Sequence, residues 1–267
     1  MIIAGAESMG DVLLDHFKKA GRPFEINDGA TVSVPNAQGD ELHLHRSPGL
    51  IEVLQDERVD AILCGDDILL ERSLQFRDHR QSGSSPYVYQ IAEYTRYGRS
   101  MVTPTLDLVV TDEKKQGLGW IEPGQIIVTE HPYILKELLR RARIKFVRIG
   151  EGYRNVPMLH NQFREWGEEY GVVGIKVIKG KAPSYLIEGQ ADAATMVNET
   201  GKTLRENRLF VAHNILPGIH TLLLVASDAK IENEWEKVWS LKEDLDIGYK
   251  LMLKAHPEGE FAGAERK

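Results

Sequence analysis

The chain has a single cysteine, Cys64, among its 267 residues, which excludes an internal disulfide and a zinc site built on cysteines. It has no uninterrupted apolar run near the ~18 residues that a membrane-spanning helix needs. The apolar start Met1–Ala4 is soon followed by glycine and acid, so the pattern of a secretory signal is missing. We therefore expect a cytoplasmic protein with no membrane partner, in which Cys64 is a small buried side chain rather than a nucleophile.

Basic residues are outnumbered by acidic ones. Lys and Arg together number 33 against 40 Asp and Glu, which gives a formal net charge of -7. Because proteins bind the nucleic-acid backbone through Lys and Arg, this balance argues against a broad nucleic-acid surface and leaves room only for a local basic pocket. Hydrophobic residues make up 42% of the chain, enough to build a buried core.

The sequence also lacks internal repeats and any linker rich in Pro, Gly and Ser. Strand-like and helix-like patterns alternate instead, which is typical of an α/β protein with a parallel or mixed sheet. The expected strands are residues 1–5, 41–46, 59–64, 106–111, 125–129, 145–149, 174–178 and 221–226. The expected helices are residues 11–19, 49–55, 132–143, 161–169, 184–189 and 231–255, the last with a break near Gly248, and residues 76–100 are expected to be a loop.

The segment Glu199-Thr200-Gly201-Lys202-Thr203 combines the groups that bind an oxyanion. Gly201 allows the backbone to turn so that successive N–H groups converge, while the two threonine hydroxyls and the Lys202 ammonium add donors. The spacing is not that of a P-loop. An N-capped helix start after a turn is the alternative interpretation, and the two stay equally weighted on the segment alone.

Two further groups of polar residues follow predicted strands, where ligand sites of open α/β sheets usually lie. Asp66 and Asp67 follow the strand at 59–64 and suit a metal or a ligand amine, although helix capping is the simpler reading. Thr129 and Glu130 follow the strand at 125–129, and either a ligand contact or a structural helix start fits them.

Three other features are weaker candidates. His43 and His45 share one face of a strand, which permits metal binding but offers no third ligand nearby, and Arg46 beside them could meet an anionic ligand. Arg154, with Tyr153, lies in a glycine-containing stretch and could bind a phosphate or a heterocycle.

The pair Trp235 and Trp239 lies one helical turn apart. We interpret it as core or as a contact with another copy of the chain, rather than as a cofactor site.

Three stretches together resemble the ATP phosphoribosyltransferases, the first enzymes of histidine biosynthesis. ADAATMVNETGKTLRENRL at 191–209 is similar to the family's 5-phosphoribosyl-pyrophosphate loop, ADAIxDLVxTGxTLxxNxL. VDAILCGDDILLE at 59–71 resembles xxDLGITGxDxLxE, and GQIIVTEHP at 124–132 resembles GxRIATEYP. The resemblance implies a two-lobed fold like type II periplasmic binding proteins, with the ligand in a cleft between the lobes. It assigns lobe I to residues 1–104 and 210–267 and lobe II to 105–209, with no regulatory domain.

Three positions depart from the family pattern. Met196 stands where the family has an acid that grips the ribose hydroxyls, and methionine cannot accept those hydrogen bonds. The stretch Glu7–Gly10 has no cation where the family faces pyrophosphate, and Pro183 falls near a position where the family carries glutamate. These changes matter because the charge of a pyrophosphate leaving group must be neutralised in the transition state.

The resemblance therefore leaves three functions open. The first is a phosphoribosyltransferase-like enzyme acting on a phosphorylated, phosphoribosyl small molecule, with Mg2+ accompanying a diphosphate substrate. The second is a non-transferase enzyme of the same fold, such as a lyase or an enzyme of rearrangement. The third is a phosphometabolite-binding protein or partner subunit without catalysis. A homodimer or higher homo-oligomer is expected in each case.

Overall fold

The computed structural model describes residues 1–46, 49–55, 58–79, 88–95, 97, 102–150, 160–226 and 228–255. The chain divides into two compact units, each an α/β body with its own sheet. Unit 1 comprises Met1–Thr103 and Ile219–Lys267, and unit 2 comprises Pro104–Gly218. Within the described part of the chain, no helix is long and apolar enough to cross a membrane.

Unit 1 is built on a five-stranded sheet in the order β2-β1-β3-β11-β4. Its strands are β1 (Ile2–Ala6), β2 (Glu41–His45), β3 (Ala61–Gly65), β4 (Val88–Tyr94) and β11 (Thr221–Ala226). Its helices are the short 3-10 helix η1 (Glu7–Met9), α1 (Gly10–Lys19), α2 (Leu50–Gln55), α3 (Asp66–His79) and α8 (Asp228–Ala255). β1 pairs in parallel with β2 and β3, whereas β11 runs antiparallel to both β3 and β4.

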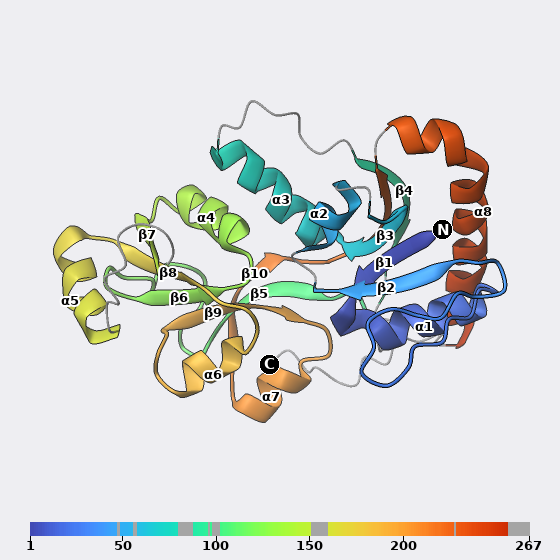
Figure 1. The fold of residues 1–267 in the computed structure, drawn as a ribbon. Coiled ribbons are helices and arrows are strands. Elements are labelled where there is room, and N and C mark those ends of the chain that lie inside the picture. Colours follow the sequence, from blue (N-terminus) through green and yellow to red (C-terminus); the bar gives the residue numbers. More distant parts are fainter. Residues whose placement is uncertain are drawn as a thin grey trace. The chain divides into compact units, whose positions relative to one another are not determined.

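Alternating side chains of these strands build two cores, one on each face of the sheet. Ile3 and Leu63 join the core beneath α1 and α8, which lie side by side in Figure 1. Ala4 and Ile62, their neighbours in sequence, join the core beneath α2 on the opposite face. Strands buried on both faces read as continuous apolar runs, which is why these strands could be located in the sequence.

Helix α8 runs without a break, so the expectation of an interruption near Gly248 was wrong. A Cβ at Gly248 would lie 2.8 Å from the Ala20 nitrogen and 2.8 Å from the His16 carbonyl oxygen. The glycine therefore serves the close approach of α8 to α1, and its position in a helix is a packing requirement.

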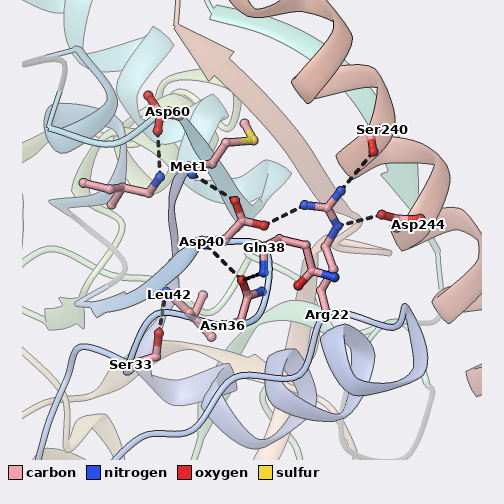
Figure 2. Close-up of polar contacts among 11 residues, drawn as sticks. Met1, Arg22, Ser33, Asn36, Gln38, Asp40, Leu42, Asp60, Ser240 and Asp244 are labelled. Carbon is pink, nitrogen blue, oxygen red and sulfur yellow. Dashed lines mark hydrogen bonds and ion pairs between the residues drawn. The ribbon is translucent and has the colours of Figure 1, made fainter.

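A buried ion network ties the ends of unit 1 together (Figure 2). Arg22 donates to Asp40 Oδ2 at 2.6 Å, to Asp244 Oδ2 at 2.6 Å and to Ser240 Oγ at 3.0 Å. The Met1 ammonium donates to the second oxygen of Asp40 at 2.9 Å. Since Arg22 and Asp40 are 8% and 4% exposed, these charges are compensated inside the protein rather than by water.

Unit 2 carries a six-stranded sheet in the order β10-β5-β9-β6-β8-β7. Its strands are β5 (Thr105–Val110), β6 (Ile126–Thr129), β7 (Phe146–Ile149), β8 (Val173–Val177), β9 (Ala193–Asn198) and β10 (Phe210–Leu216). Its helices are α4 (Pro132–Arg141), α5 (His160–Tyr170), α6 (Ala182–Ile187) and α7 (Lys202–Asn207). β6, β7, β8 and β9 form the parallel part, and β5 pairs antiparallel with both β9 and β10.

Three strands, β4, β9 and β10, lie where the sequence had indicated none. β4 falls within residues 76–100, which were expected to be a loop, and it forms an edge strand on β11. β10 pairs with β5, and this pairing holds residues 210–218 in unit 2. The chain therefore returns to unit 1 after Gly218 and not, as expected, after Leu209.

Candidate functional site

The segment from Glu199 to Thr203, the 199–203 turn, links the end of β9 to the start of α7 in unit 2. Gly201 adopts the left-handed conformation with φ 69°, which a residue with a side chain rarely accepts. A Cβ at this position would also lie 2.9 Å from Arg205 Nη1. The backbone conformation therefore favours glycine here, whereas the Arg205 side chain is flexible and could move away from a Cβ.

Cations and hydroxyl groups surround this turn. The Lys202 side chain is 73% exposed, and its Nζ lies 3.7 Å from Glu206 Oε1, a surface pair that costs little to open. Arg205 Nη1 donates to the Thr200 carbonyl oxygen at 3.1 Å and so brings a second cation to the turn. Thr200 and Thr203 are exposed. The sequence reasoning missed Arg205, although its i+4 spacing from Gly201 on a helix start was the available signal.

The backbone N–H groups of the turn were expected to converge on a ligand, but at least one of them is bonded within the protein. Gly201 N donates to Asn198 Oδ1 at 2.9 Å, so this N–H is taken inside the protein instead of pointing at a ligand. Lys202 N donates weakly to Thr200 Oγ1 at 3.4 Å. The exposed donors around the turn include the Thr200 and Thr203 hydroxyls and the two cations, Lys202 and Arg205.

A buried carboxylate lies directly across the sheet from Met196. Asp107 of β5 is the antiparallel partner of Met196 in β9, so their side chains share one face of the sheet. Asp107 is 2% exposed and accepts hydrogen bonds from Thr105, Asn198 and Asn214. Because it is buried among these donors, Asp107 does not offer a ligand the exposed carboxylate that the family pattern has at position 196.

Of the other two candidate residues in unit 2, Thr129 is buried and Glu130 is exposed. Thr129 is fully buried, where its hydroxyl accepts from His131 N at 2.9 Å and shares a 2.5 Å hydrogen bond with Thr195 Oγ1. This bond joins β6 to β9, which gives Thr129 a structural role. Glu130 is exposed, and its Oε1 lies 3.6 Å from the Cβ position of Gly180.

In unit 1, Asp66 and Asp67 begin α3 directly after β3. His220 N donates to Asp66 Oδ1 at 3.2 Å, and Asp66 N donates to the His220 carbonyl oxygen at 2.9 Å. Burial raises the pKa of the Asp66 carboxyl, and the neighbouring Asp67 adds to this, while the hydrogen bond from His220 N opposes it. Asp67 is only 5% exposed, with its Oδ1 packed against Gly65, so Asp66 is the carboxylate of the pair that reaches solvent.

The remaining candidates lie at the end of β2 or outside the described residues. Arg46 is exposed just after β2. His43 Nε2 lies 3.0 Å from Glu41 Oε2, and burial, with His43 and Arg58 nearby, lowers the pKa of His45. In the part of the chain that the structure describes, no three His, Cys, Asp or Glu residues form a metal site. Arg154 and Tyr153 lie outside the described residues.

Comparisons with known proteins give one family and one fold. A family model described as ATP phosphoribosyltransferase matches residues 46–246. No curated protein matches the chain.

Among solved structures, the chain is similar to the ATP phosphoribosyl transferase (HisG:HisZ) complex from Thermotoga maritima, with 18% identity, 94% of this chain and 98% of that chain covered, and a TM-score of 0.58. It is also similar to the periplasmic aliphatic sulphonate binding protein SsuA from Escherichia coli, with 11% identity, coverage of 97% and 75%, and a TM-score of 0.56. A third similar structure is XAC2383 from Xanthomonas citri bound to ATP, with 12% identity, coverage of 93% and 88%, and a TM-score of 0.52. At these identities the likeness is one of fold, and it confirms the type II periplasmic-binding-protein-like fold.

Proposed function

Because the chain belongs to the ATP phosphoribosyltransferase family, which confirms the resemblance seen in the sequence, we propose that it acts on a phosphorylated, phosphoribosyl small molecule. The phosphate is held by the 199–203 turn of unit 2. The observation that carries this proposal is the left-handed Gly201, around which Thr203, Lys202 and Arg205 present a hydroxyl and two cations to solvent.

Charge-assisted hydrogen bonds from Lys and Arg are the strong contacts to a phosphate group. Lys202 is a mobile point charge on a flexible stem, whereas the Arg205 guanidinium is fixed by its bond to the Thr200 carbonyl oxygen. Within the family reaction, a bound phosphate would orient the ribosyl carbon for attack. Orientation and charge stabilisation would then supply the catalysis, without a covalent role for these side chains.

Magnesium enters the proposal through the substrate. Mg2+ is commonly held by one or two carboxylates together with substrate phosphates, rather than by a cage of protein ligands alone. In unit 1, Asp66 is the proposed carboxylate contact and Arg46 the proposed anion contact, because both reach solvent. Asp67 is only 5% exposed and is therefore not proposed as a contact.

Calorimetric titration with phosphoribosyl pyrophosphate, with and without Mg2+ and ATP, tests this function. We expect binding accompanied by pyrophosphate release when all three are present. Lys202→Ala should weaken binding about tenfold or more, since a hydrogen bond to a charged group is lost. Lys250→Ala is the matched control. Lys250 is an exposed lysine on α8, far from the turn in sequence, and this variant should bind like the unchanged chain. Loss of affinity in both variants, or in neither, would contradict the assignment of the turn.

A second function is favoured by the positions that have lost family groups. Met196 packs against the core of unit 2, and η1 offers Glu7 and Ser8 to solvent with no cation. Pro183 lies in the first turn of α6 and carries no acid. A non-transferase enzyme or a binding subunit for sugar phosphates needs none of these groups. Binding of ribose 5-phosphate without any pyrophosphate release from phosphoribosyl pyrophosphate would select this second function.

A further inference from the structure

Asp107 is a buried acid that the proposed function does not use. It lies in β5, between β9 and β10, and is 2% exposed. Oδ2 accepts from Thr105 Oγ1 at 2.8 Å and from Asn198 Nδ2 at 3.1 Å, while Oδ1 accepts from Asn214 Nδ2 at 2.7 Å. A buried carboxylate is costly unless donors surround it in this way, so its presence calls for a role.

The carboxylate determines how the Asn198 side chain is oriented. An ionised carboxylate only accepts hydrogen bonds, so Asn198 must turn its Nδ2 towards Asp107. Its Oδ1 is thereby directed away, and this oxygen accepts from Gly201 N at 2.9 Å. A continuous chain of hydrogen bonds thus runs from the buried acid to the left-handed glycine of the 199–203 turn.

We propose that Asp107 and Asn198 are positioning residues for the 199–203 turn. Asp107 fixes the Asn198 amide, and Asn198 fixes the Gly201 backbone, on which the directions of Lys202 and Thr203 depend. The role in ligand binding rests on the proposed function, because it assumes that the turn holds a phosphate. The role in shaping the turn does not, since the Gly201 amide can be observed by itself.

Asn214 supplies the matched control. It donates to the same carboxylate as Asn198, but from β10 and through the other oxygen. Truncating either asparagine removes one hydrogen bond from Asp107. Only Asn198→Ala also releases the Gly201 amide.

The experiment combines titration with inorganic phosphate and NMR of the Gly201 amide. We expect Asn198→Ala to weaken phosphate binding about tenfold, the effect of losing one well-formed hydrogen bond in the turn. The Gly201 amide should exchange faster with solvent and shift its resonance in the same variant. Asn214→Ala should leave the Gly201 amide unchanged and phosphate affinity within about twofold of the unchanged chain.

An exchange of partners tests the direction of the hydrogen bonds. Asn198→Asp alone places two carboxylates in contact and should disturb the turn. Adding Asp107→Asn restores one donor and one acceptor between the two positions, while residue 198 keeps an oxygen for Gly201 N. The double variant should therefore recover the Gly201 resonance that Asn198→Asp loses, which a purely packing role for Asp107 would not predict.

The outcomes separate this inference from the proposed function. If phosphate binds, and Lys202→Ala weakens it, but Asn198→Ala changes neither the affinity nor the Gly201 amide, the positioning inference is overturned. If the unchanged chain binds no phosphate, the proposed function falls. The Gly201 amide in Asn198→Ala then still decides whether Asp107 and Asn198 shape the turn.

Discussion

His16 gives unit 1 a pH-dependent stability that can be worked out from its surroundings. The side chain is fully buried, with Nδ1 2.8 Å from Tyr97 Oη and Nε2 2.7 Å from the Leu245 carbonyl oxygen. The carbonyl can only accept, so Nε2 donates and the neutral ring accepts from Tyr97 at Nδ1. Burial lowers the pKa of His16 from 6.5 to about 4, against the hydrogen bond to Leu245 and the charges of Asp15 and Asp246, while Lys19 lowers it slightly further.

The sign follows from proton binding. Between pH 6.5 and pH 4 the unfolded chain binds a proton at His16 and the folded chain does not, so folding loses stability as the pH falls through this range. From pH 7 to pH 5 the loss attributable to His16 is about 2 kcal/mol. Below pH 4 it approaches a limit of about 3 kcal/mol.

Urea unfolding at pH 7, 6 and 5, followed by circular dichroism, measures this loss. His16→Gln keeps one donor and one acceptor but cannot titrate. Between pH 7 and pH 5 its free energy of unfolding should therefore fall by ~2 kcal/mol less than that of the unchanged chain. A constant stability difference between the unchanged chain and His16→Gln across this pH range would refute the reasoning.

Three further predictions concern the rest of the chain. Arg22→Ala leaves buried Asp40 without its main partner and should cost about 3 kcal/mol in denaturant unfolding, whereas Arg141→Ala, which opens an exposed ion pair, should cost less than about 0.5 kcal/mol. Burial, together with Asp67 and Asp66, raises the pKa of the Cys64 thiol, so a thiol reagent should label it only after unfolding, and labelling of the folded chain would contradict this. If the expected homo-oligomer forms through the stacked Trp235 and Trp239, which are 43% and 42% exposed, Trp239→Lys should lower the sedimentation mass to that of one chain, and an unchanged mass would exclude this face.

The sequence located most of the secondary structure because its strands are buried on both faces. A short continuous apolar run with a turn at each end, such as Ala61–Cys64, indicates a buried strand. β4 was missed because an edge strand with one exposed face carries a mixed polar pattern, as in VYQIAEY. Gly248 was misread because helix propensity was the only guide, and the close contact with α1 that explains it is tertiary.

We expected Trp235 and Trp239 to be either core residues or a contact between copies of the chain, and the first alternative was wrong. Both rings are exposed, so the core reading fails and the contact between copies stays a prediction.

The candidate site could likewise be predicted only where it depends on residues that are close together in the sequence. The 199–203 turn could be located from five neighbouring residues, because a glycine between hydroxyls and a cation is a local pattern. The support from Asp107 could not, since its bond to Asn198 joins residues 91 positions apart. Thr129 was read as a possible ligand contact because nothing in its neighbourhood reveals that its hydroxyl turns inward to Thr195.

The strand order of unit 1 also bears on how the chain folds. β11 stands between β3 and β4, so β4 has no strand to pair with until residues 221–226 have been made. Unit 2, by contrast, is one uninterrupted stretch from Pro104 to Gly218 and is complete before β11 emerges. During synthesis the middle of the chain can therefore reach its native fold first. Until β11 has been made, β3 is an edge strand with unpaired backbone groups. Because exposed edge strands can pair with other chains, this is the stage of folding at which we expect aggregation.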